Sequence, residues 1–143
     1  LFSQNKLKEI EVEFHKARRM TIYLTLPIII IIIAFRKQLL SLFGDDFVYG
    51  ETALTIIVCG LLINVFSGSV DYFLNMTNHQ KPLRTFTIIS AVINIVLNYF
   101  LIKEMGINGA AIASVISSLT INLLCVFYIK KQFGFYTFFQ LKK

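Results

Sequence analysis

The amino-acid sequence predicts an all-α membrane protein with four transmembrane helices. Hydrophobic residues make up 56% of the 143 residues and charged residues only 15%, whereas about a quarter of an ordinary soluble domain is charged. The apolar residues also gather in four long runs, as bilayer-spanning helices require. A soluble helical bundle would need a polar stripe along every helix, and residues 28–35 and 119–129 supply none.

The first 35 residues combine a charged stretch with an apolar one. Residues 1–19 place apolar side chains at helical spacing among lysines and glutamates, which predicts a cytoplasmic amphipathic linker. The first span follows at about residues 20–35 and includes six consecutive isoleucines. Its length of about 24 Å is short for the hydrocarbon core, so the apolar residues beyond it are expected to complete the crossing at the interface. Pro27 is expected to kink this helix.

Three further apolar runs follow, separated by polar turns. The second span is predicted at about residues 52–77, and a hydrophilic connection that contains Pro82 leads to the third span at about 83–102. A short turn precedes the fourth span at about 108–129. Residues 20–129 thus form a four-helix transmembrane region, and residues 130–143 form a basic and aromatic cytoplasmic tail.

Orientation follows from where the basic residues fall. The sequence has 14 Lys and Arg residues, and such residues accumulate in cytoplasmic loops. With both ends in the cytoplasm, Arg36, Lys37 and Lys103 face outward and the other eleven face inward. We therefore expect a multi-pass protein of the cell membrane with both ends cytoplasmic. The net charge of +6 then reflects topology, and no nucleic acid is expected as a partner.

Polar side chains recur at spacings of three and four within the second and third spans. Lipid-facing positions have no use for amides and carboxylates, so these residues indicate faces that line a cavity or pack against protein. Hydrogen bonding between helices is the alternative interpretation, above all for the serines and threonines. The candidates for a substrate or ion cavity are Asn64, Asp71, Asn75, Asn94 and Asn98.

Asp71 is the one ionisable residue of the second span. A charged group at the centre of a membrane helix costs about 2.5 to 3.5 kcal/mol on insertion scales, so its presence needs a reason. It could bind a cation or proton or contact a polar substrate, or it could pair with a basic residue such as Arg84. The sequence leaves both interpretations open.

The fourth span begins with small residues at four-residue spacing. Such rows let two helix backbones approach closely, which predicts tight helix packing. We find no nucleophile with a base, no paired catalytic carboxylates, no phosphate-binding glycine loop and no metal-binding cluster, so no enzyme, metal or cofactor is expected. The predicted packing residues are Gly106, Gly109, Ala110, Ala113 and Ser114.

Two segments resemble a known superfamily. They are Asn94-Ile-Val-Leu-Asn98 and Gly106-Ile-Asn-Gly109-Ala-Ala-Ile-Ala-Ser114. This pattern is similar to that of polysaccharide flippases of the multidrug/oligosaccharidyl-lipid/polysaccharide exporter superfamily. The resemblance implies about twelve to fourteen helices in two lobes with the substrate path between them. The four helices would then be the last four of one six-helix lobe, preferably the second, and the chain a fragment of a longer protein.

The resemblance also implies a function. A polysaccharide flippase would move a lipid-linked oligosaccharide to the outer leaflet for surface-polysaccharide biosynthesis. Its partners would be the lipid bilayer, the pyrophosphate headgroup of the substrate and the remaining helices of the transporter, which are expected to supply most cationic groups. One alternative is a multidrug and toxin extrusion antiporter in which Asp71 carries the coupling ion, and another is a structural membrane scaffold subunit.

Overall fold

The computed structural model describes residues 4–67 and 70–133, so residues 134–143 of the predicted tail lie outside the described residues. Within the described ranges the chain forms helices and turns and contains no strand, which confirms the all-α prediction. The elements are α1 (Gln4–Ala34), α2 (Arg36–Ser41), the 3-10 helix η1 (Asp45–Gly50), α3 (Glu51–Ser67), α4 (Val70–Met76), α5 (Gln80–Met105) and α6 (Ile107–Phe133).

Four stretches of helix are long and apolar enough to cross a membrane, as predicted. Among the described side chains, most large apolar ones of α1 and α5 are exposed, including Leu24 and Ile95. Contiguous exposed apolar faces of this kind fit lipid or neighbouring helices rather than water. The candidate spans are Lys16–Ala34, Asp46–Ser67, Gln80–Met105 and Ile107–Phe133.

The first span continues the preceding linker without a break. Helix α1 runs through the junction between the expected linker and the expected span, and it keeps Pro27 inside it. The charged N-terminal part and the apolar part are therefore one element. This continuity carries Arg18, the next to last residue of the expected linker, into the span that begins at Lys16.

The second expected run contains two helices. Helix α3 ends at Ser67, and the seven-residue helix α4 starts at Val70. The two residues between them lie outside the described residues. Beyond α4 the chain turns at Asn78, whose φ of 63° is a left-handed conformation that asparagine tolerates, and His79 N–H donates to the Leu74 carbonyl at 2.9 Å.

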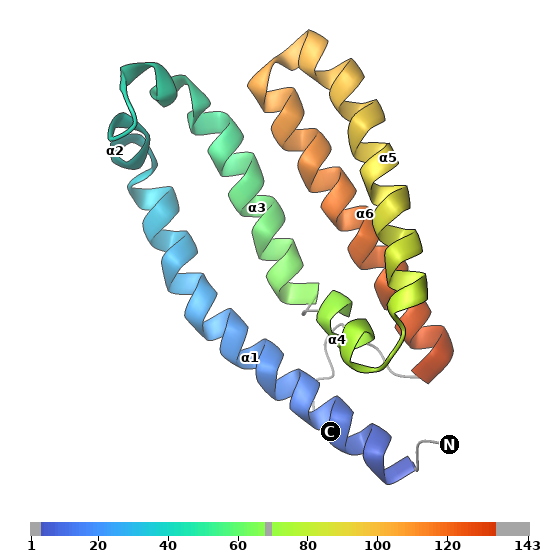
Figure 1. Ribbon diagram of the computed structural model, residues 1–143. Coiled ribbons are helices and arrows are strands. Elements are labelled where there is room, and N and C mark those ends of the chain that lie inside the picture. Colours follow the sequence, from blue (N-terminus) through green and yellow to red (C-terminus); the bar gives the residue numbers. More distant parts are fainter. Residues whose placement is uncertain (1–3, 68–69, 134–143) are drawn as a thin grey trace.

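The helices are arranged around α6. Figure 1 shows α3 (green) between α1 (blue) and the hairpin formed by α5 and α6, and α6 contacts α3, α4 and α5. The start of α1, helix α4 and the end of α6 lie at one end of the bundle, which we call the lower end (Figure 1). Helix α2, η1 and the turn between α5 and α6 lie at the opposite, upper end.

Glycines allow α6 to approach both neighbours closely. A Cβ added at Gly109 would overlap the backbone carbonyl oxygen of Leu101 on α5, and one added at Gly60 of α3 would overlap the side chain of Val115 on α6. Further down, Ser90 Oγ on α5 donates to the carbonyl oxygen of Ser117 at 2.6 Å. Close backbone approach through small residues is typical of membrane helices, which gain little from apolar burial against one another.

The other predicted packing residues differ in their surroundings. Ala113 is fully buried. Gly106 ends α5 with a φ of 57°, a conformation that favours glycine, and an added Cβ there would meet no atom within 4 Å. Ala110 and Ser114 line an apolar hollow at the upper end beneath η1.

We predict that Gly109→Ala lowers the free energy of unfolding by about 1 to 3 kcal/mol, because the new methyl group meets backbone that cannot move without shifting a helix. Unfolding of the purified protein by titration with a denaturing detergent measures this change. Ser114→Ala is the matched control on the same helix, since the Ser114 side chain is exposed, and it should change stability by less than about 0.5 kcal/mol. Equal stability of both variants would contradict the close approach.

Candidate functional site

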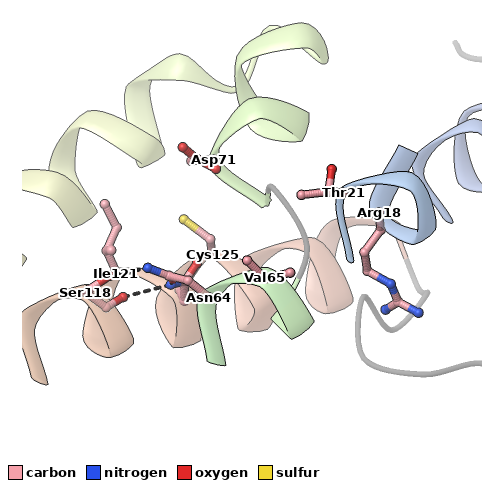
Figure 2. A pocket seen from close by; sticks show the side chains of 9 residues that line it. Arg18, Thr21, Asn64, Val65, Asp71, Ser118, Ile121 and Cys125 are labelled. Atoms are coloured by element: carbon pink, nitrogen blue, oxygen red, sulfur yellow. Dashed lines mark hydrogen bonds between the residues drawn. The ribbon is translucent and has the colours of Figure 1, made fainter. Parts of the chain in front are cut away.

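A polar pocket of about 260 Å³ lies where four helices meet (Figure 2). Helix α1 supplies its edge, α3 and α6 supply polar groups side by side, and α4 supplies a carboxylate. Its lower part adjoins the apolar core that α4 forms with the last turns of α6. The lining residues are Arg18, Thr21, Asn64, Val65, Asp71, Ser118, Ile121, Asn122 and Cys125.

A network of hydrogen bonds between α3 and α6 forms the centre of the polar pocket. The Nδ2 amide of Asn64 donates to Ser118 Oγ at 2.6 Å. The Nδ2 amide of Asn122 donates to Asn64 Oδ1 and, at 2.9 Å, to the backbone carbonyl of Ser118. These partners satisfy amides that would otherwise cost several kcal/mol inside a membrane. The network therefore joins two spans that are 54 residues apart at this contact.

Opposite charges lie on different sides of the polar pocket. Figure 2 shows Arg18 and Thr21 on α1 at one side, Asp71 on α4 at another, and Asn64 beside Ser118 of α6. Arg18 is half-buried and Asp71 is exposed. Arg18, a carboxylate, amides and hydroxyls thus line one volume, and Figure 2 shows the Arg18 guanidinium directed away from Asn64 and Asp71. Such a lining can accept a ligand that carries hydroxyl groups and charged groups.

The alternative pairing of Asp71 with Arg84 does not occur among the described residues. Both side chains are described, and they line different pockets. The ion pairs found within residues 4–67 and 70–133 join Arg36 and Lys37 to Glu51 at the upper end of the bundle. Asp71 therefore faces the polar pocket without an ion pair to the arginine that the sequence suggested.

The structure brings together two of the five candidate cavity residues, Asn64 and Asp71. Asn75 lines a separate hollow of about 450 Å³ between α4 and α5, beside Arg84. Asn98 Nδ2 donates to Asn94 Oδ1 at 2.9 Å along α5, so these two amides pair with each other outside the polar pocket. The polar stripes of α3 and α5 therefore do not meet across one common volume.

Two lining residues that carry strong polar groups, Arg18 and Asn122, are not among the candidates predicted from the sequence. Arg18 was assigned to the linker 1–19, although α1 carries it into the span. Asn122 continues the four-residue period that starts at Gly106 and passes through Ser118. That period, followed one step further, would have placed an amide on the same face as the small residues.

The described part of the chain contains no group of three His, Cys, Asp or Glu side chains that could hold a metal ion. His79 instead packs its ring edge-on against Tyr128, with centroids 5.8 Å apart. Cys59 and Cys125 are free thiols, the first exposed and the second buried beside the polar pocket.

Four apolar spans, three of which line a polar pocket, define a multi-pass helical membrane protein. Residues 1–100 match the model of the MatE family, and the chain belongs to this family of the multidrug/oligosaccharidyl-lipid/polysaccharide exporter superfamily. The superfamily resemblance predicted from the sequence is thereby confirmed. The families concerned are transporters.

One curated relative is the probable low-salt glycan biosynthesis flippase Agl15 of Haloferax volcanii, which is 26% identical over 128 residues. The aligned region covers 89% of this chain and 27% of the relative. The chain therefore spans about a quarter of the length of that relative. None of the solved structures matches the chain.

We predict that Asn64 and Asn122 are energetically coupled. In a double-mutant cycle, Asn64→Ala and Asn122→Ala should show a coupling energy of about 0.6 to 1.7 kcal/mol, the range of interhelical hydrogen bonds in membranes. Detergent-induced unfolding of the four proteins measures it. The control cycle pairs Asn64→Ala with Asn98→Ala, whose amide bonds within α5, and should be additive. Additivity in both cycles would show that α3 and α6 do not share this network.

Proposed function

We propose that the chain is part of a flippase that translocates a lipid-linked oligosaccharide across the cell membrane for surface-polysaccharide biosynthesis. The four helices belong to a six-helix lobe, and the substrate path lies between this lobe and a second one. The polar pocket contacts the pyrophosphate-sugar headgroup while the lipid tail stays in the bilayer. The relative with the flippase name and the chemistry of the pocket both support this proposal.

The position of Arg18 in the lining of the polar pocket is the main support for the proposal. The sequence suggested that this chain contributes few cations at cavity depth, yet α1 places Arg18 among the residues that line the polar pocket. Guanidinium groups match the geometry of phosphate oxygens and hold their charge at every physiological pH. Asn64, Ser118 and Asn122 offer the mixture of donors and acceptors that sugar hydroxyls require.

The proposed orientation places both ends in the cytoplasm. Arg18, Lys81 and Lys130 belong to the lower half of the bundle, together with most other basic residues. Lys103 and the pair Arg36 and Lys37 belong to the upper end. The positive-inside tendency then makes the lower end cytoplasmic, so the polar pocket lies near the leaflet from which the substrate is loaded.

The loaded headgroup has to cross the membrane by movement of one lobe relative to the other, as in other carriers built from repeats. The chain spans about a quarter of its curated relative, so the opposite wall of the substrate path belongs to helices outside this chain. Further cationic groups from those helices are part of the proposal, because a pyrophosphate carries more negative charge than one arginine neutralises.

A multidrug and toxin extrusion antiporter is the second candidate function. The exposed Asp71 carboxylate, which has no ion pair with Arg84, favours it. In such a transporter Asp71 would bind the coupling proton or cation and an organic cation would be the substrate. A scaffold subunit is the third candidate, and the amide network between α3 and α6 would then serve packing alone.

We predict that Arg18→Gln reduces surface glycan at least about tenfold when the full-length variant replaces the native gene, because a hydrogen bond to a charged group contributes about 1.5 to 3 kcal/mol. Extraction and quantification of surface glycan, at equal protein level in the membrane, measure this. Arg19→Gln is the matched control, since the neighbouring Arg19 side chain is exposed and does not line the polar pocket. It should retain full export.

Three outcomes would contradict the flippase proposal. Unchanged glycan with Arg18→Gln removes its central observation. Loss of drug resistance but not of glycan on deletion of the gene favours the antiporter, and Asp71→Asn should then reproduce that loss. Loss of neither, together with failure of cysteine reagents to reach Asn64→Cys or Asp71→Cys, favours the scaffold because packed positions exclude water.

A further inference from the structure

A further hollow lies between the start of α5 and the end of α6, and we call it the lower groove. It has a volume of about 500 Å³ and shares no residue with the polar pocket. Nothing in the proposed transport function uses it. The lining residues are Phe86, Leu124, Phe127, Tyr128, Lys130 and Lys131.

The inner part of the lower groove is apolar and aromatic. Leu124, Phe127 and Tyr128 follow one another at spacings of three and one along α6, so they share one side of the helix. From α5, Phe86 packs edge-on against Tyr128 with ring centroids 5.9 Å apart, which closes one wall. The Phe127 side chain is 68% exposed, so a large apolar surface is open to a partner.

The other part of the lower groove is cationic. Lys130 and Lys131 are exposed in the last turn of α6, at the end of its membrane span. The six lining residues include these two lysines and no carboxylate. Leu124 lies seven residues before Lys131, which is about 10 Å along the helix axis. Charge and apolar surface are thus separated along the axis of α6, as they are along the length of an amphiphile.

We propose that the lower groove binds an anionic phospholipid of the surrounding bilayer. The headgroup phosphate lies against Lys130 and Lys131, and an acyl chain lies along Leu124 and Phe127. Basic hollows between membrane helices at the cytoplasmic side are suited to such headgroups, and each lysine near the surface favours anionic lipid. A zwitterionic lipid fills the same apolar surface but gains much less from the lysines.

The test uses tryptophan fluorescence, because the chain has no tryptophan of its own. The full chain with Phe127→Trp is reconstituted in vesicles that contain brominated phosphatidylglycerol or brominated phosphatidylcholine, whose bromines quench a tryptophan in contact. Phe100→Trp is the matched control, because Phe100 is an exposed phenylalanine of α5 outside the groove. Leu124→Trp provides a second reporter if Phe127→Trp is recovered poorly.

The groove reporter should be half-quenched at about a fivefold lower mole fraction of the anionic lipid, the preference expected from even one effective lysine. Phe100→Trp should show no such preference. Adding Lys130→Gln and Lys131→Gln to Phe127→Trp should abolish the preference. Adding Lys81→Gln and Arg84→Gln, which removes the same charge from the neighbouring hollow, should preserve it.

Equal quenching of Phe127→Trp by both lipids would overturn the proposal. So would a preference that survives loss of both lysines, or one that disappears equally with Lys81→Gln and Arg84→Gln, which would indicate general surface charge. Absence of quenching at both groove reporters, with normal quenching of Phe100→Trp, would show that protein covers the groove. None of these results depends on whether the protein is a flippase.

Discussion

At Gly109 the backbone of α6 lies so close to the Leu101 carbonyl that no Cβ fits, and at Gly60 the backbone of α3 meets Val115 of α6 in the same way. Lipid tails are as apolar as leucine, so helices in a bilayer associate through such close contacts and through hydrogen bonds. These two contacts fix α3 and α5 on different sides of α6. The polar pocket and the lower groove both depend on that arrangement, since α6 contributes to each.

Hydrogen bonds between polar side chains form where the glycines let α3 and α6 pack closely. Once α3 lies against α6, Asn64 reaches Ser118 and Asn122, and the three residues hydrogen-bond to one another. Helix α4 then packs Val70 and Leu74 onto the last turns of α6, which positions Asp71 at the same pocket. The site is thus a consequence of helix packing, and its polar residues stabilise the bundle as well as shape the pocket.

Much of the fold could be predicted from the sequence, because apolar runs and turn residues report directly on which segments cross a membrane. The single helix from Gln4 to Ala34 could not, because the change from charged to apolar residues does not by itself end a helix. For the site, helical spacing identified Asn64 and Asp71 as polar positions. Spacing predicts which face of a helix a residue occupies but not which neighbouring helix that face contacts. The pairing of Asn98 with Asn94 and the place of Asn122 in the polar pocket could therefore not be predicted.

The contact between α3 and α6 at the polar pocket is the central claim, and cross-linking in native membranes tests it most directly. With Cys59→Ala and Cys125→Ala to remove the native thiols, Asn64→Cys and Ser118→Cys should be joined by a short bifunctional thiol reagent. Asn98→Cys with Ser118→Cys should not, since the contact of Ser90 with Ser117 places residue 98 about 12 Å further along α5. Cross-linking of the first pair alone is the predicted result. Failure of that pair, or equal cross-linking of both, would contradict the packing on which the polar pocket rests.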